Sequence, residues 1–263
     1  MNILETIIET KKSAVRSKKA EVKVSDLEKS NFFKREVLSL GKSLIDKTRT
    51  GIIAEFKRKS PSRGIINDHS DIVQTTYAYT KNGASALSVL TDEDFFGGSS
   101  DDLIKARIHE IPILRKDFVI DEYQIIEAKS IGADAILLIA ACLSPQQVKN
   151  LAKFAKTLHL EVLLELHGEE ELEHICDDTE IVGINNRDLK TFAVDIERSL
   201  RMAEKIPSSK IKVAESGISS VENILLFKRN GFKGFLIGEN FMSAEDPAIA
   251  FASFVTKLKT VSS

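Results

Sequence analysis

One stretch of the chain, residues 51–62, combines an apolar run with closely spaced charges. The run is typical of a buried strand, and it leads into Glu55 and Lys57, two residues apart. Because side chains on a strand alternate between its faces, these two share one face. A turn follows at once, with cations and hydroxyls at Arg58, Lys59, Ser60, Ser62 and Arg63. Such a turn is typical of a phosphate site, although a solvated edge with a surface ion pair would give the same pattern.

Polar side chains also follow several later apolar runs. Lys116, Glu165, Asn185 and Glu215 each stand at the end of such a run, and Arg187 comes just after one. A charge buried singly is costly, so charges of both signs should converge and compensate. We therefore interpret Lys116 and Glu165, together with Lys57, as a catalytic group. The alternative is a set of ion pairs that only close the end of the structure.

Two further strand ends carry glycine beside polar residues. Ser216 and Gly217 follow one apolar run, and Gly238 and Glu239 follow the last. Glycine lets the backbone approach an anion closely, and barrel enzymes often bind phosphate after their last two strands. The pattern predicts a phosphate site here, although two ordinary turn glycines would look the same.

The elements that position these residues alternate along the chain. Short apolar runs predict strands at residues 51–56, 86–90, 113–116, 135–141, 161–166, 181–185, 212–215 and 234–238. Amphipathic segments predict helices at 72–81, 101–108, 121–130, 145–158, 169–175, 196–206, 221–229 and 247–258. Eight strands, each followed by a helix, predict a closed parallel (βα)8 TIM barrel with its active site at the carboxyl ends of the strands.

A weak internal repeat favours this barrel. Gly83, Gly132 and Gly231 each stand shortly before an apolar run, and the second spacing is about twice the first. Each glycine suits a left-handed helix end before the next strand. An open doubly wound sheet would be less regular, and it would usually show a glycine-rich dinucleotide motif after its first strand, which this sequence lacks.

Residues 1–48 precede the first predicted strand and read as helical. Ile3, Leu4, Ile7 and Ile8 form one apolar stripe, and the pair Phe32-Phe33 would be exposed in a solvated arm. We expect a single barrel domain over residues 1–263, in which residues 1–48 form an N-terminal helical extension that covers the barrel mouth.

Composition narrows the possible partners. A formal net charge of −2 argues against a nucleic-acid binder, and two cysteines are too few for a disulfide framework or a zinc site. The N-terminus does not read as a signal peptide, and no apolar run is long enough to cross a membrane. We expect a cytoplasmic protein, a monomer or weak homo-oligomer, with no nucleic-acid or membrane partner.

These motifs together resemble a known family. Residues 53–62 (IAEFKRKSPS) closely resemble the first-strand motif of indole-3-glycerol phosphate synthase. Further motifs in the family's order lie at 88–99, 112–118, 163–167, 183–189, 213–218 and 235–238. Each is moderately specific, but all of them in register are very specific. Asn186 and Glu239 depart from the pattern, because many relatives carry small hydroxyl residues there.

The resemblance implies a reaction and its acid–base groups. The family closes the indole ring of 1-(2-carboxyphenylamino)-1-deoxyribulose 5-phosphate with loss of carbon dioxide and water, and no metal or cofactor is implied. By resemblance, Lys116 is the proton donor at ring closure and Glu165 the acid/base of dehydration. Lys57 shares proton delivery, and the assignment between the two lysines stays open. Glu55 and Asn185 would orient these groups.

The resemblance also implies how the phosphorylated substrate is held. Phe96 and Phe118 would line the anthranilate pocket, and Arg187 and Glu215 would hold polar substrate groups. The phosphate contacts would come from Lys57, Ser60, Ser216, Gly217, Gly238 and the backbone near Glu239. Two alternatives remain at this stage: a related phosphate-binding barrel such as phosphoribosylanthranilate isomerase, and a barrel that binds a ligand without catalysis.

Overall fold

The computed structural model describes residues 3–188 and 191–262, and within them the strands form a closed parallel barrel. Its strands are β1 (Ile52–Phe56), β4 (Ala86–Leu90), β5 (Ile113–Lys116), β6 (Ala135–Ile139), β7 (Glu161–Leu166), β8 (Ile181–Asn185), β9 (Ile211–Glu215) and β10 (Gly234–Ile237). β1 pairs with both β4 and β10, which closes the ring. The predicted TIM barrel is confirmed.

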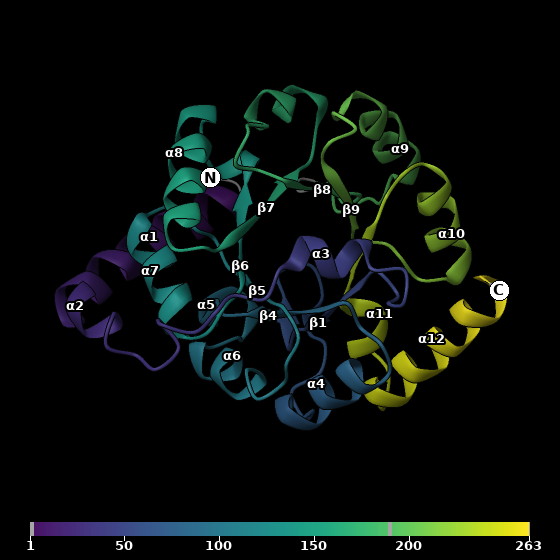
Figure 1. Cartoon of the computed structure of the whole chain (residues 1–263), viewed down its shortest axis with the longest axis horizontal. Coiled ribbons are helices and arrows are strands. Elements are labelled where there is room, and N and C mark those ends of the chain that lie inside the picture. The colour runs from purple at the N-terminus through teal and green to yellow at the C-terminus, as the bar shows by residue number, and fades with distance from the viewer. Residues whose placement is uncertain (1–2, 189–190, 263) are drawn as a thin grey trace.

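Helices surround the barrel (Figure 1). They are α4 (Ile72–Lys81), α6 (Ser100–Ala106), α7 (Glu122–Ser130), α8 (Pro145–Thr157), α9 (Ile196–Lys205), α10 (Val221–Arg229) and α12 (Pro247–Ser262). Gly83, Gly132 and Gly231 follow α4, α7 and α10 with φ of 99°, 95° and 85°. The predicted left-handed helix ends are therefore confirmed, and each lets the chain turn directly into the next strand.

Short elements add detail that the apolar pattern did not predict. They are α5 (Glu93–Phe96), α11 (Glu239–Met242), the two-residue strands β2 (Lys59–Ser60) and β3 (Gly64–Ile65), and the 3₁₀ turn η1 (Ala140–Cys142). The helix predicted at 169–175 is instead the 3₁₀ segment η2 (Glu169–His174). Glu171 turns its carboxylate back to accept from the amide of His167 at 2.6 Å, which ties this segment to the end of β7.

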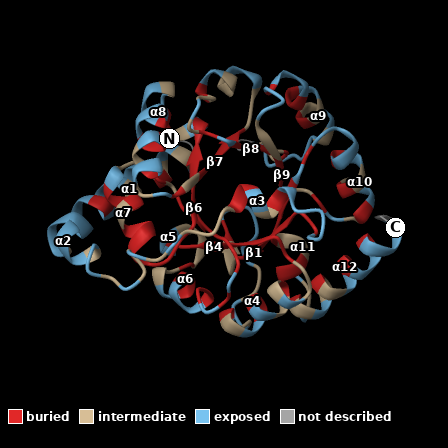
Figure 2. Ribbon diagram, viewed as in Figure 1, coloured by how far each residue is buried: buried red, intermediate tan, exposed pale blue. Residues whose placement is uncertain are grey.

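Two apolar layers hold the barrel together. The interior is filled from the strands, for example by Ile53, Leu114 and Leu163, and a larger cluster packs the outer strand faces against the helices. Figure 2 shows this division, with buried strands at the centre and exposed outer helix faces.

The N-terminal extension divides between the two ends of the barrel. α1 (Ile3–Glu21) lies at the mouth, where Ile3, Leu4 and Ile7 line a cavity, and α2 (Val24–Leu27) packs beside α7. α3 (Leu40–Ile45) lies over the opposite end, across the centre of the ring in Figure 1. Only part of the extension is therefore at the mouth, whereas we expected all of residues 1–48 there.

Apolar and polar contacts explain why α3 closes the far end. Leu40 and Leu44 belong to the same buried cluster as the barrel interior. Ser39 Oγ and Gly41 N both donate to the carboxylate of Glu161, the first residue of β7, at 2.6 and 2.8 Å. These contacts lie at the amino ends of the strands, at the end opposite to α1.

Candidate active site

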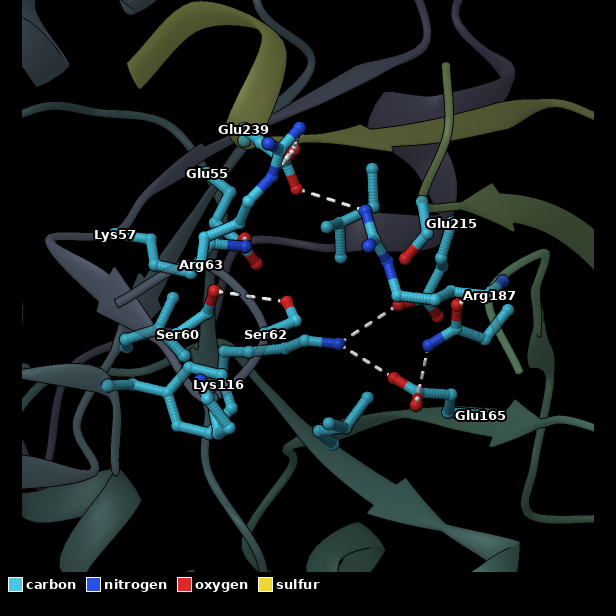
Figure 3. Close-up of a pocket in the computed structure, with 18 of the residues that line it drawn as sticks. Glu55, Lys57, Ser60, Ser62, Arg63, Lys116, Glu165, Arg187, Glu215 and Glu239 are labelled. Carbon is cyan, nitrogen blue, oxygen red and sulfur yellow. Dashed lines mark hydrogen bonds and ion pairs between the residues drawn. The ribbon is translucent and has the colours of Figure 1, made fainter. Parts of the chain in front are cut away.

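A cavity of about 410 Å³ opens at the carboxyl ends of the strands. The residues predicted to act in catalysis or to hold the substrate all line it, and Figure 3 labels several of them. They are Glu55, Lys57, Ser60, Phe96, Lys116, Phe118, Glu165, Asn185, Arg187, Glu215, Ser216, Gly217, Gly238 and Glu239. Arg58 and Lys59 of the predicted phosphate turn do not line the cavity, because they donate instead to Asp102 at 2.6 Å and to the carbonyl of Asp94 at 2.8 Å. Parallel strands that close into a ring bring their ends together, so positions far apart in sequence meet in one cavity.

The ammonium group of Lys116 lies between two carboxylates, as Figure 3 shows. Its Nζ donates to Glu165 Oε2 at 2.7 Å and to Glu215 Oε2 at 2.9 Å. The three residues come from the ends of β5, β7 and β9, which alternate around the ring. Gly183 on β8 makes room for this group, because a Cβ there would lie 2.1 Å from Glu215 Oε1.

Burial and mutual attraction shift the acidities of this cluster in different directions. Burial disfavours the Lys116 ammonium, but Glu165 and Glu215 outweigh it and raise the pKa of Lys116 above its ordinary value. Burial also opposes the Glu165 carboxylate, yet Lys116 and His167 hold the pKa of Glu165 well below its usual range. For Glu215, burial and the nearby Glu165 charge prevail over Lys116 and raise the pKa to about 8. The cluster therefore favours an ionised Glu165 beside a Glu215 that readily keeps its proton.

Two more side chains approach the second oxygen of Glu165. Asn185 Nδ2 donates to Oε1 at 3.1 Å. His167 Nε2 lies 3.0 Å from the same oxygen, but its ring is not aligned for a hydrogen bond within the described residues. Burial lowers the pKa of His167, whereas Glu165 raises it more, so the net shift is upward. We did not select His167 from the sequence, although its spacing of two residues from Glu165 on a strand end was an available signal.

Lys57 belongs to a separate pair on β1. Its Nζ donates to Glu55 Oε1 at 2.7 Å, and Ser88 Oγ donates to Glu55 Oε2 at 3.3 Å. Gly238 permits this approach, since a Cβ there would lie 2.5 Å from Glu55 Oε1. The spacing of Glu55 and Lys57 on one strand face thus predicted their pairing, and both point into the cavity with Lys116.

The backbone after β9 has an unusual conformation. Ser216 and Gly217 both lie in the left-handed region, with φ of 65° and 69°. Such strain at a non-glycine residue is often concentrated at binding sites. Gly217 is further restricted, because a Cβ there would lie 2.3 Å from Val194. Asn186, one of the two departures from the family pattern, lies outside the cavity and donates to the carbonyl of Ser216 at 2.7 Å.

An aromatic wall bounds another side of the cavity. The rings of Phe96 and Phe118 lie 6.1 Å apart at an angle of 40°. Ile3, Leu4 and Ile7 of α1 extend this apolar lining. A flat hydrophobic ring such as an anthranilate fits such a wall.

A buried ion network ties α1 to the loops that carry these aromatic residues. Lys11 Nζ lies 2.7 Å from Asp92, which caps α5, and 2.8 Å from Asp117, which follows Lys116. Asp117 also contacts Arg115 at 3.0 Å. Lys11 and Asp92 were not selected from the sequence, because nothing local marks a lysine on a charged helix as the partner of distant carboxylates.

The described part of the chain offers no group of three or more histidine, cysteine or acidic side chains arranged to hold a metal ion. None of its helices is long and apolar enough to cross a membrane. Leu189, the last residue of the 183–189 motif, lies outside the described residues.

Comparison with known proteins identifies the family. The sequence model of the family named indole-3-glycerol phosphate synthase matches residues 4–254. The chain belongs to this family. Relatives with the same name come from Bacteroides thetaiotaomicron, 44% identical over 98% of this chain and 99% of that protein, and from Caldanaerobacter subterraneus subsp. tengcongensis, 44% identical over 98% and 99%.

Solved structures support the fold. A tryptophan synthase α-subunit from Pyrococcus furiosus matches with a TM-score of 0.61 at 15% identity, over 81% of this chain and 99% of that chain. A structure titled native KDPGal matches with a TM-score of 0.60 at 14% identity, over 82% and 96%. At such identities the likeness concerns the barrel alone. Family membership, by contrast, sets aside both the isomerase and the non-catalytic alternative.

Proposed function

We propose that Lys116, Glu165 and their neighbours in this cavity carry out the indole-3-glycerol phosphate synthase reaction. The observation that carries the proposal is the Lys116 ammonium held between Glu165 and Glu215 in the cavity lining. An ammonium donor and a carboxylate within hydrogen-bond distance of each other are the groups that acid–base catalysis of this reaction needs.

The activity itself follows from family membership. The protein is a carboxy-lyase of tryptophan biosynthesis that acts on a phosphorylated small molecule. In the reaction, the ring carbon that bears the carboxylate attacks the C2′ ketone of 1-(2-carboxyphenylamino)-1-deoxyribulose 5-phosphate. Carbon dioxide leaves, and water leaves next, giving indole-3-glycerol phosphate.

We assign ring closure to Lys116. As the new bond forms, the ketone oxygen gains negative charge and must take a proton. An alkoxide is a stronger base than an amine, so it can take the proton of Lys116 even though Glu165 and Glu215 raise the pKa of that ammonium. In the transition state the cation also stabilises the developing charge, in a site largely shielded from water.

We assign dehydration to Glu165. Its lowered pKa keeps it ionised and ready to remove the ring proton. Once protonated, the same group can return a proton to the departing hydroxyl. Asn185 fixes its second oxygen, and Glu55 holds Lys57 as a second cation facing the substrate.

The remaining assignments concern binding. Phe96 and Phe118 would hold the anthranilate ring, while Arg187 and Glu215 contact polar substrate groups. The phosphate would lie near the strained Ser216-Gly217 backbone. Its other contacts would be Lys57, Ser60, Gly238 and the backbone at Glu239. Support for this arrangement is that all of these residues line one cavity.

Lys116→Arg and Lys116→Met test the choice of proton donor. Arginine keeps the charge but is a poor acid near neutral pH, and methionine removes the charge at similar length. If Lys116 donates the proton, both variants lose at least about 100-fold in kcat, measured by indole fluorescence, and both still bind the product. The same pair of changes at Lys57 is the control and should cost less.

An active arginine variant beside an inactive methionine variant would show that Lys116 acts through its charge. Lys57 would then be the better donor.

We also propose that the protein works in the cytoplasm as a monomer or weak homo-oligomer. Its few cysteines and modest net charge suit that setting. Light scattering across a concentration series would test the oligomeric state, and a constant dimer mass at every concentration would contradict it.

A further inference from the structure

Glu239, a departure from the family pattern, is the centre of an ion cluster at the rim of the cavity. Its Oε1 accepts from Arg63 Nε at 2.8 Å and lies 2.7 Å from Arg63 Nη2. Its Oε2 accepts from Arg187 Nη2 at 3.0 Å. Figure 3 shows this carboxylate joining two guanidinium groups that come from different loops.

Arg63 reaches the cluster from a small hairpin. β2 and β3 pair antiparallel, with Ser60 opposite Gly64, so Arg63 lies in the tight turn between them. Its side chain is 63% exposed, whereas that of Arg187 is 23% exposed. Exposed ion pairs contribute little net stability, so Arg63 can exchange its partner at small cost while Arg187 stays.

The position of Glu239 creates an electrostatic problem for the reaction. Its carboxylate follows Gly238 directly, at the place proposed for the phosphate. A phosphate dianion and an unpaired carboxylate would repel each other there. Arg187 can neutralise Glu239, and Arg63, which lines the same cavity beside Ser60 and Ser62, remains for the phosphate.

We propose that Arg63 is a phosphate-binding residue that Glu239 holds at the cavity rim until substrate arrives. The phosphate draws Arg63 away from Glu239, and Glu239 keeps Arg187 as its partner. The guanidinium fork suits a phosphate as well as it suits a carboxylate. This inference rests on the proposed location of the phosphate, and it makes Glu239 a competitor of the substrate for one arginine.

Arg63→Ala tests the direct contact. We expect the KM for the phosphorylated substrate and the inhibition constant of inorganic phosphate each to rise about tenfold, since a charge-assisted contact is lost. kcat should stay within about twofold of the parent, because the contact holds ground state and transition state alike. Arg63→Lys should recover part of the loss. Arg229→Ala is the control: it removes an exposed arginine at the end of α10, outside the cavity lining, and should change neither constant.

Glu239→Gln tests the exchange. When Arg63 is present, removing the competing carboxylate should lower the KM and the phosphate inhibition constant about threefold, a typical size for an exposed charge pair. In the Arg63→Ala background the same change should give at most half of that gain, because there is no Arg63 to release. This non-additivity is the signature of the exchange.

Two results would overturn the inference. One is an Arg63→Ala variant whose phosphate inhibition constant and KM stay within twofold of the parent. The other is an equal gain from Glu239→Gln in both backgrounds. Binding of inorganic phosphate, followed by calorimetry, needs no turnover. If the parent protein formed no indole-3-glycerol phosphate, the proposed function would be wrong. If Arg63→Ala still weakened phosphate binding in that case, the phosphate contact would nevertheless be supported.

Discussion

At the scale of single residues, two glutamates in the cavity differ in acidity because their surroundings differ. Glu165 and Glu215 share Lys116, yet the pKa of Glu165 lies below its usual range and that of Glu215 is raised to about 8. The difference follows from the additional contacts. Asn185 donates to Glu165 and His167 Nε2 lies 3.0 Å from it, whereas Glu215 Oε1 has no hydrogen-bond partner in the described part of the chain.

The raised pKa of Glu215 predicts a pH-dependent stability. Unfolded, this carboxyl loses its proton near its ordinary value of 4.5, but the folded protein retains it up to about pH 8. Between these values the native state binds more protons, so the free energy of unfolding falls as pH rises, by at most about 1.4 kcal/mol per pH unit. Glu215→Gln removes this titration. Its melting temperature relative to the parent should therefore rise steadily from pH 5 to pH 8.

The control for this experiment is Glu245→Gln, an exposed carboxyl outside the cavity lining. A difference in melting temperature that is flat with pH would show that Glu215 is ionised in the folded protein throughout.

At the scale of elements, the first helix acts as part of the active-site wall. Removing residues 1–45 would be a poor test of this, because the deletion would also take away α3 and uncover the far end of the barrel. Lys11 offers a cleaner test. It is the point where α1 meets two buried carboxylates, on the loops that follow β4 and β5.

Lys11→Met should loosen α1 and the two loops together. Asp117 would keep Arg115, but Asp92 would lose the ammonium that pairs with it, and a buried charge left unpaired typically costs about 3–5 kcal/mol. We expect a lower melting temperature and a KM raised about tenfold, because α1 lines the cavity and α5 carries Phe96. The measurements are thermal unfolding and steady-state kinetics.

Lys12→Met is the matched control for Lys11. The neighbouring lysine pairs with Glu9 on the helix surface, where the two side chains are 55% and 62% exposed. Such a pair contributes little, so the change should leave melting temperature and KM as they are. Equal behaviour of the two variants would mean that the buried network does not position the loops.

At the scale of the whole molecule, the barrel separates stability from catalysis along its axis. α3 fills the amino end with Leu40 and Leu44, whereas the reacting groups lie at the carboxyl end. Substitutions at the two ends should therefore affect different measurements. This separation is typical of the fold, in which loops at one end vary without disturbing the core.

Leu44→Ala tests that separation. Leu44 is only 4% exposed, and shortening a buried leucine to alanine costs about 2–5 kcal/mol. We expect weaker resistance to urea with unchanged kcat and KM at 25 °C, since the cavity is at the other end. Ile45→Ala, on the next residue of the same helix and 54% exposed, should change neither. A large fall in kcat for Leu44→Ala would contradict the separation.

The sequence by itself determined the barrel and most of the cavity. Apolar runs alternate with amphipathic segments, and a parallel strand buried on both faces must be an apolar run. Lys116, Glu165 and Glu215 could be selected because a polar residue at the end of such a run has only the mouth of the barrel to face. These residues are far apart in the sequence, but they could be grouped without knowing the distances between them in space, because ring closure brings the strand ends together.

Only the tertiary structure decided which charges on different strands and loops are partners. The spacing on β1 placed Lys57 beside Glu55, but nothing in the sequence showed that Lys116 is held between Glu165 and Glu215. The tertiary structure also revealed the contacts of Lys11 and Glu239 with residues that are distant along the chain. The physical reason is that the position of a strand end follows from a local pattern of burial. An ion pair depends instead on the direction in which a long side chain leaves its own loop, and the packing of the neighbouring loops sets that direction.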